Sequence, residues 1–212
     1  MLKTKWWATA LLCFSGVVLS PYIVTWRAGY MGNGGILFVA GMLKWASILF
    51  GMIMGTYILW REMSQWKSFS ITKRCIYAML VCGFIFLPIG SLLFGPEPAT
   101  IFLHGVITRL NGEVNADRLR GWAREVLGNT NGQGPMVMIA ATDVPKEIQN
   151  IEHYPVPRGY VESSPSLDKR YVSLRWGGGF FGWGMMIGDT NLTFETDDTC
   201  LIWKPGIFVF VR

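Results

Sequence analysis

The sequence predicts a membrane anchor of three transmembrane α-helices followed by a C-terminal α+β domain with an antiparallel sheet. Three apolar runs fill the first 95 residues, and each is about long enough to cross a bilayer, which takes roughly 20 apolar residues in a helix. No comparable run follows Gly95, where short strand-like segments alternate with turn residues. We therefore expect a transmembrane region over residues 1–95 and a soluble domain over residues 96–212.

The apolar runs carry basic residues at their ends. They comprise Trp6–Trp26, Ile36–Trp60 and Cys75–Phe94. Before residue 96, eight Lys and Arg residues stand against a single acid, Glu62, whereas eleven stand against thirteen acids in the rest of the chain. The pI of about 9.1 therefore comes from residues near the apolar runs, and we do not expect nucleic-acid binding.

The charges of the loops predict one orientation, because Lys and Arg in short loops favour the cytoplasmic side of a membrane. They place the N-terminus and the second loop in the cytoplasm, and the first loop and the C-terminal domain outside. We expect the first run to stay as an uncleaved anchor, because no small-x-small cleavage site follows it. The basic residues are Lys3 and Lys5 before the first run, Arg27 in the first loop, and Arg61, Lys67, Lys73 and Arg74 in the second.

Lys44 is the one charged residue well inside an apolar run, eight residues after its start. An intramembrane charge is costly, so such a residue is a candidate for function. The three runs contain no acid to pair with it. We therefore favour a side chain that snorkels to the outer interface over a role in transport.

Two glycines of the second run, Gly51 and Gly55, stand at the small-xxx-small spacing that allows close contact between membrane helices. Glycine is also tolerated in such helices without a packing role. Of these two interpretations we favour the second.

The clearest helix of the C-terminal domain begins after Asn115, a good N-cap residue, and ends near Gly128. Its apolar residues recur at helical spacing from Leu119 to Leu127. The opposite, basic face either contacts lipid headgroups or a partner, or is solvated, and we favour solvation. That face contains Arg118, Arg120 and Arg124.

The remaining segments predict a mostly β structure. Residues Thr100 to Leu110 form either a helix or a strand, and a short helix follows Pro145. Because the connections are too short for crossover helices, neighbouring strands should be antiparallel. The expected strands are 136–141, 160–162, 171–176, 183–187, 192–195, 200–203 and 207–211.

The most distinctive string is Trp176-Gly-Gly-Gly-Phe-Phe-Gly-Trp-Gly184. A phosphate-binding loop needs a following helix, usually with Lys and Ser or Thr, whereas here a strand-like segment follows. The glycines suit a tight turn with positive φ. The aromatic residues then either pack inside the domain or form a contact surface, and packing is the interpretation that we favour. They are Trp176, Phe180, Phe181 and Trp183.

The sequence offers no catalytic, cofactor-binding or metal-binding set of residues. The two histidines, His104 and His153, have no Cys, His or carboxylate nearby at metal-ligand spacing. Only Cys200 lies in the C-terminal part, so a disulfide within that domain is excluded. We expect no cofactor.

Three segments carry a resemblance to a known family: Leu119-Arg-Gly-Trp-Ala123, the stretch from Trp176 to Gly188, and Trp203-Lys-Pro-Gly-Ile-Phe208. On these residues the C-terminal half resembles a family of uncharacterised bacterial membrane proteins. The resemblance implies a bacterial origin and a membrane anchor ahead of the domain, and together with the loop charges we expect a bacterial inner-membrane protein with a periplasmic domain. It implies no activity and supplies no catalytic residues.

These observations lead to a functional hypothesis. We expect a non-enzymatic integral membrane protein whose external domain contacts a membrane or envelope protein or another envelope component. One alternative is an accessory subunit of a larger membrane complex, with the helices as the contact surface. A weaker alternative is a membrane-bound hydrolase that uses scattered Asp, Glu and His residues.

Overall fold

The chain forms two compact units in the computed structural model. The helical unit comprises Met1–Val24 and Val39–Pro96, and the sheet unit comprises Thr25–Phe38 and Glu97–Arg212. These units differ from the predicted division into residues 1–95 and 96–212 at Thr25–Phe38, which belongs to the sheet unit. The structure describes residues 2–63, 69–130, 136–151, 157–164, 169–177, 182–194, 196–197 and 199–211.

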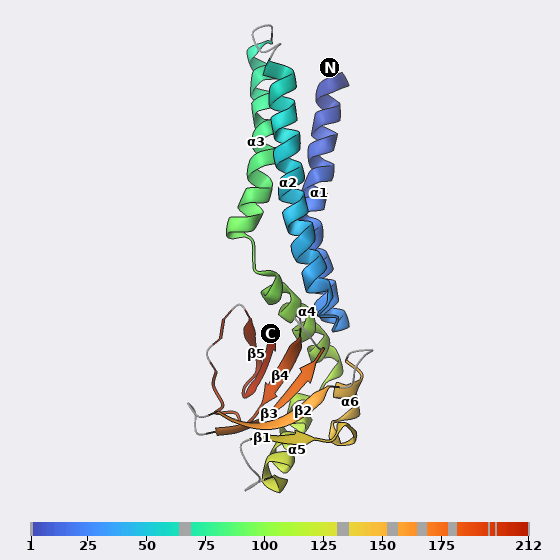
Figure 1. Cartoon of the computed structure of the whole chain (residues 1–212), viewed down its shortest axis with the longest axis vertical. Helices are drawn as coiled ribbons and strands as arrows, with labels where there is room; N and C mark the ends of the chain where they lie inside the picture. Colours follow the sequence, from blue (N-terminus) through green and yellow to red (C-terminus); the bar gives the residue numbers. More distant parts are fainter. Residues whose placement is uncertain are drawn as a thin grey trace. The chain divides into compact units, whose positions relative to one another are not determined.

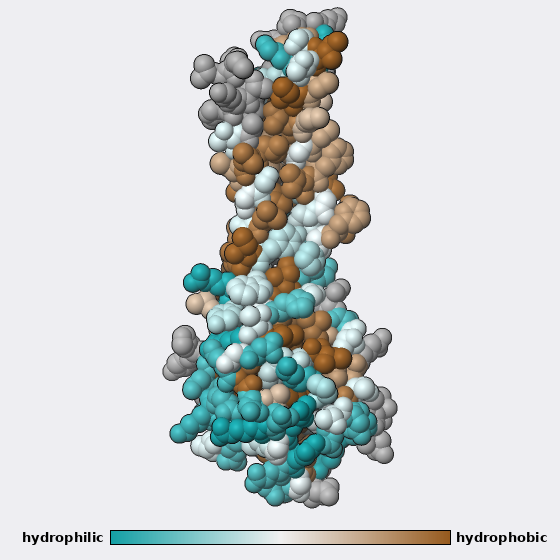
Figure 2. Space-filling view, turned by 180° about the vertical axis from the view of Figure 1, so that it is seen from behind, coloured by the Kyte–Doolittle hydropathy of each residue, from teal (hydrophilic) through white to brown (hydrophobic). Residues whose placement is uncertain are grey.

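Three long helices confirm the apolar helices expected from the sequence: α1 (Leu2–Met31), α2 (Ile36–Met63) and α3 (Ile71–Phe94) (Figure 1). Each contains a stretch that is long and apolar enough to cross a membrane. These stretches have 23, 26 and 21 residues, and most of their side chains are not buried inside the protein. On the face shown in Figure 2, hydrophobic surface predominates over the long helices.

Inside the helical unit, the two glycines of α2 lie directly against α3. A Cβ atom on Gly51 would lie 2.5 Å from the Phe84 carbonyl oxygen, and one on Gly55 would lie 2.7 Å from Cγ1 of Ile85. Only a glycine allows helices to approach this closely. The structure therefore shows the close contact, and the incidental role that we favoured for these glycines is wrong.

The sheet unit contains a six-stranded antiparallel sheet in the order β1-β2-β3-β4-β6-β5, as the short connections predicted. The expected strand over 192–195 is wrong, because residues 192–194 are not in a strand and residue 195 lies outside the described residues. The strands are β1 (Met136–Ile139), β2 (Arg158–Ser164), β3 (Lys169–Trp176), β4 (Trp183–Ile187), β5 (Cys200–Lys204) and β6 (Ile207–Val211).

Helices α4 (Pro98–Glu113) and α5 (Ala116–Asn129) cover one face of this sheet (Figure 1). Residues 100–110, for which the sequence allowed either a helix or a strand, are therefore helical. The predicted N-cap is confirmed, because the Asn115 side chain accepts hydrogen bonds from the backbone N–H groups of Asp117 and Arg118, 3.0 Å away in each case. Two short elements, a 3-10 helix over Ala141–Asp143 and α6 (Lys146–Gln149), follow β1.

The end of α1 and the start of α2 complete the core of the sheet unit. Ala28 and Leu37 are buried in the same apolar cluster as α4, α5 and the sheet. Gly29 lies so close to α4 that a Cβ atom there would overlap the backbone carbonyl of Phe102. The unit is therefore assembled from two separate pieces of chain.

Candidate contact surfaces

The sheet has an outer face, turned away from α4 and α5. Side chains alternate between the two faces of a strand, so every second residue belongs to this face. The strand register aligns six of these residues in one row that crosses all six strands. In spatial order they are Met138, Tyr160, Ser173, Met186, Phe208 and Ile202.

The half of this face over β6 is covered by the segment that follows β4. Leu192 from this segment is buried with Cys200 and Phe208. Phe194 packs edge-on against the rings of Phe208 and Tyr171, with centroids 5.1 and 5.2 Å apart. This cover explains why the apolar residues near 192 resembled a strand in sequence, although they form a packed loop.

The half over β1 to β3 is more open, and we call its residues Met136, Met138, Tyr160, Glu162 and Arg175 the outer-face patch. Met136 is 60% exposed and Met138 is 75% exposed, on an edge strand. The Arg175 guanidinium pairs with Oε1 of Glu162 and lies 5.4 Å from the Tyr160 ring centroid. Methionine and tyrosine beside an arginine are typical of surfaces that bind other proteins.

The charged group at the centre of this patch is fixed by its neighbours. The Tyr171 hydroxyl donates to Oε2 of Glu162 at 3.1 Å, so both oxygens of that carboxylate accept hydrogen bonds. Burial and the adjacent Glu162 charge raise the pKa of Tyr171 to about 12. Tyr171 therefore keeps its proton above the usual range, and its hydroxyl and Arg175 both hold the Glu162 carboxylate.

Two of the four predicted aromatic contact residues lie in the core. The indole rings of Trp176 and Trp183 stack at a centroid distance of 4.3 Å, and each residue is 1% exposed. Gly177 has a φ of 78°, in agreement with the predicted tight turn. Phe180 and Phe181 lie outside the described residues, so a contact surface there stays a prediction, whereas the two tryptophans have packing contacts.

The arginine residues of the basic face of α5 have hydrogen-bond and ion-pair partners within the sheet unit. Arg118 pairs with Glu147 at 3.1 Å, and Arg124 pairs with Asp189 at 2.9 Å. Arg120 donates to the Pro205 carbonyl oxygen at 2.8 Å. The prediction of a simply solvated face is therefore incomplete, because these guanidinium groups have partners within the unit.

Lys44 contacts the other two helices of the helical unit through Tyr22. Its ammonium group lies 5.7 Å from the centroid of the Tyr22 ring. The Tyr22 hydroxyl in turn donates to the Ser91 carbonyl oxygen at 2.8 Å. Residues of α1, α2 and α3 therefore meet at one level.

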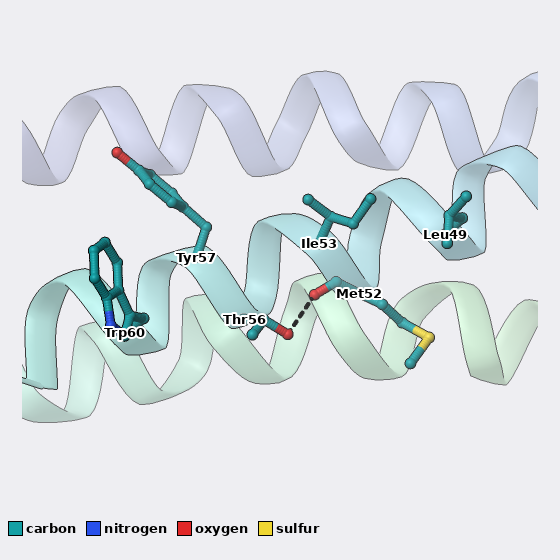
Figure 3. Close-up of a pocket in the computed structure, with 6 residues that line it drawn as sticks. All are labelled: Leu49, Met52, Ile53, Thr56, Tyr57 and Trp60. Carbon is teal, nitrogen blue, oxygen red and sulfur yellow. Dashed lines mark hydrogen bonds between the residues drawn. The ribbon is translucent and has the colours of Figure 1, made fainter.

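A shallow groove of about 550 Å³ runs along the outward side of α2 (Figure 3). The Thr56 hydroxyl donates to the Met52 carbonyl oxygen of the same helix at 2.8 Å. The groove is therefore apolar, apart from the Tyr57 hydroxyl and the Trp60 indole N–H near its end. It is lined by Leu49, Met52, Ile53, Thr56, Tyr57 and Trp60.

No group of three or more His, Cys, Asp or Glu residues that could hold a metal ion occurs in the described part of the chain. His104 is exposed on α4, and His153 lies outside the described residues. The fold and these surfaces define a protein with three potential membrane-spanning helices and a separate antiparallel sheet unit. Comparisons with protein-family models, with curated proteins and with solved structures found no match.

Proposed function

We propose that this chain is an integral membrane protein whose three helices anchor an external α+β domain, and that this domain contacts a partner protein or another envelope component. The proposed anchor is supported by the apolar side chains that the three long helices expose on their outward face. Large apolar side chains such as Leu12, Leu49 and Met79 are 74%, 63% and 74% exposed there. Side chains of this kind need hydrocarbon or another protein around them.

The contacts within the sheet unit support the proposed orientation. The loop between α1 and α2 and the chain after α3 belong to the same unit, so both must be on the same side of a membrane. Two crossings, by α2 and α3, return the chain to that side. The basic residues of the second loop then favour the cytoplasm for that loop and the outside, the periplasm of a bacterial cell, for the sheet unit.

Cysteine labelling tests this orientation in the full chain. In a variant without the four native cysteines, Thr190→Cys should react with a membrane-impermeant maleimide added outside the cell. Ser70→Cys, before α3, should react only after the membrane is opened. Both positions are exposed, so the difference reports the side of the membrane. The opposite pattern would contradict the proposed topology.

For the contact itself, the outer-face patch is the surface that the geometry favours. A photoreactive amino acid at Met138 should crosslink the full chain in its native membrane to a defined partner, which mass spectrometry identifies. The same amino acid at Glu125, an exposed position on α5, is the matched control. Equal crosslinking at the two positions, or none at Met138, would count against this surface.

The α2 groove favours the second candidate function, an accessory subunit of a larger membrane complex. Its residues Ile53 and Trp60 are 58% and 77% exposed, which suits contact with a neighbouring helix as well as with lipid. Extraction in a gentle detergent separates the two proposals. Stoichiometric partners that are lost on Ile53→Trp would favour the subunit, whereas partners lost on Met138→Lys would favour the external contact surface.

A further inference from the structure

The junction of Tyr22, Lys44 and Ser91 joins three helices at one level and contains a cation. We infer that this junction marks the outer boundary of the bilayer hydrocarbon, and that the Lys44 ammonium binds the phosphate groups of outer-leaflet phospholipids. The start of α2 before Lys44 then lies outside the hydrocarbon. The inference rests on the proposed membrane anchor and assigns its depth and its lipid contact.

The spacing of polar residues on the three helices supports this boundary. Lys44 lies 17 residues before Arg61 on α2, and Ser91 lies 17 residues after Arg74 on α3. On α1, Tyr22 lies 17 residues after Lys5. At 1.5 Å per residue each segment is about 26 Å long, which approaches the roughly 30 Å of a bilayer core when long side chains reach the headgroups.

The packing of the helices shows that these segments are in register. Phe14 of α1 contacts Phe50 of α2 and Phe84 of α3, with ring centroids 5.8 and 5.1 Å apart. Along their own helices, these three residues lie eight, six and seven residues from Tyr22, Lys44 and Ser91 respectively. The three helices therefore have similar distances between the phenylalanine cluster and the junction.

The apolar residues before Lys44 have another explanation than lipid contact. Leu37 is 8% exposed and belongs to the core of the sheet unit, against which Ile36 also packs. The beginning of the second apolar run is therefore hydrophobic because it builds a protein core. Hydrophobicity alone predicts that the membrane segment begins at Ile36. The contacts of Ile36 and Leu37 with the core of the sheet unit place its beginning near Lys44 instead.

The side chains between Lys44 and Arg61 have the distribution of a membrane segment. Trp45 is 64% exposed at one end, and Trp60 is 77% exposed at the other. Tryptophan favours both interfaces of a bilayer. The apolar groove begins at Leu49, after Trp45 in the chain, and is lined at its other end by Trp60 (Figure 3). Lys44 directly precedes Trp45 at the outer end of this segment, where a phosphate satisfies its charge.

Four residues on one side of α2 provide a depth ruler. Phe38, Met42, Leu49 and Ile53 are 55%, 59%, 63% and 58% exposed in the protein, so differences in labelling report the bilayer. Each is changed singly to Cys in the full chain without native cysteines, in vesicles of phosphatidylethanolamine and phosphatidylglycerol. A polar maleimide is supplied on both sides of the vesicle membrane.

We expect positions 38 and 42 to react and positions 49 and 53 to be protected. Protection of all four would move the boundary to the start of α2, and reaction at position 49 would move it below Lys44. Either result overturns the inference. Because the reagent is on both sides, the ruler gives the depth in either orientation, while Thr190→Cys labelled from outside alone tests the topology separately.

The role of the charge is tested on the Met42→Cys background. Lys44→Leu should let the hydrocarbon boundary rise toward Phe38, so that labelling at position 42 is lost. Lys44→Arg keeps a phosphate ligand and should keep the labelling. Phe38→Cys should react in all three backgrounds, which shows that the reagent reaches the start of α2 in each variant. Unchanged labelling of Met42→Cys with Leu at position 44 would show that Lys44 binds no lipid phosphate that sets the depth.

Discussion

The indole Nε1 of Trp183 donates a hydrogen bond to the carbonyl oxygen of Gly32 at 3.0 Å, across 151 positions of sequence. This bond connects the centre of the sheet to the turn between α1 and α2. Gly32 is buried and has a φ of 73°, a conformation that favours glycine. The turn is thus a structural part of the sheet unit and not a free loop.

Trp183→Phe should lower the free energy of unfolding by about 1–3 kcal/mol, because it leaves the buried Gly32 carbonyl without its donor. Trp176→Phe is the matched control. Trp176 stacks on Trp183 and is equally buried, but Nε1 of Trp176 has no hydrogen-bond partner in the part of the chain that the structure describes. Thermal unfolding of the full chain in detergent measures both variants. Equal losses would show that the bond to Gly32 contributes nothing.

Gly29→Ala should destabilise the sheet unit by about 1–3 kcal/mol, because the new methyl group must displace the Phe102 backbone in α4. Gly112→Ala, at the other end of α4, meets no atom within 4 Å and should be neutral or stabilise the helix by up to about 1 kcal/mol. Chemical unfolding followed by tryptophan fluorescence compares them. A neutral Gly29→Ala would show that α1 and α4 do not cross at this distance.

The packing of α2 on α3 gives a similar prediction for the helical unit. Gly51→Ala should reduce the melting temperature in detergent, since its Cβ would press on the Phe84 carbonyl of α3. Gly41→Ala, on the same helix with open space around it, should leave the melting temperature unchanged or raise it. If both changes have the same effect, the close contact is not important for stability.

The pKa of Tyr171, raised to about 12, predicts a contribution to stability that depends on pH. Between pH 10 and 12 the folded state keeps a proton that the unfolded state has released, so this contribution is complete below pH 10 and is lost as the pH rises through 12. Tyr171→Phe should therefore show a smaller alkaline loss of stability. Tyrosinate absorbance at 295 nm checks the assignment, and a Tyr171 that titrates near pH 10 would contradict it.

Residues 97–212 without the N-terminal segment should form a less stable unit, because Ala28 and Leu37 are then missing from the core. A chain that joins residues 25–38 to residues 97–212 by a flexible linker should recover cooperative unfolding. Hydrogen exchange at the amides of β4 and α4 compares the two. If both fragments are equally protected, Thr25–Phe38 only lies on the surface of a complete domain.

Sequence patterns predicted the parts of this fold that depend on local signals. Long apolar runs gave α1 to α3, Asn115 gave the start of α5, and the turn residues gave an antiparallel sheet. The loop around Leu192 was mistaken for a strand, because a segment that packs on a sheet needs the same apolar residues as a strand.

The assignment of Thr25–Phe38 to the sheet unit was not predictable from local sequence. Leu37 is hydrophobic whether it faces lipid or a protein core, so hydropathy does not distinguish the two. The ion pairs of Arg118 and Arg124 were also not predictable from local sequence, because their partners, Glu147 and Asp189, are distant in sequence. For the outer-face patch, the alternation along β2 and β3 was a signal, but the row exists only once the strand register is known.

The split composition of the sheet unit has a consequence for biogenesis. Synthesis proceeds from the N-terminus, so Thr25–Phe38 leaves the ribosome before the chain that forms α2 beyond Phe38 and α3, and long before β6. In a membrane-inserted chain this early segment must wait for its partners until the α2–α3 hairpin has crossed the bilayer twice. A chain in which only one of these two helices crosses leaves the two pieces on opposite sides of the membrane, and Leu37 and Ala28 then cannot reach their core. The sheet unit can therefore be completed only in a chain whose two pieces are on the same side of the membrane.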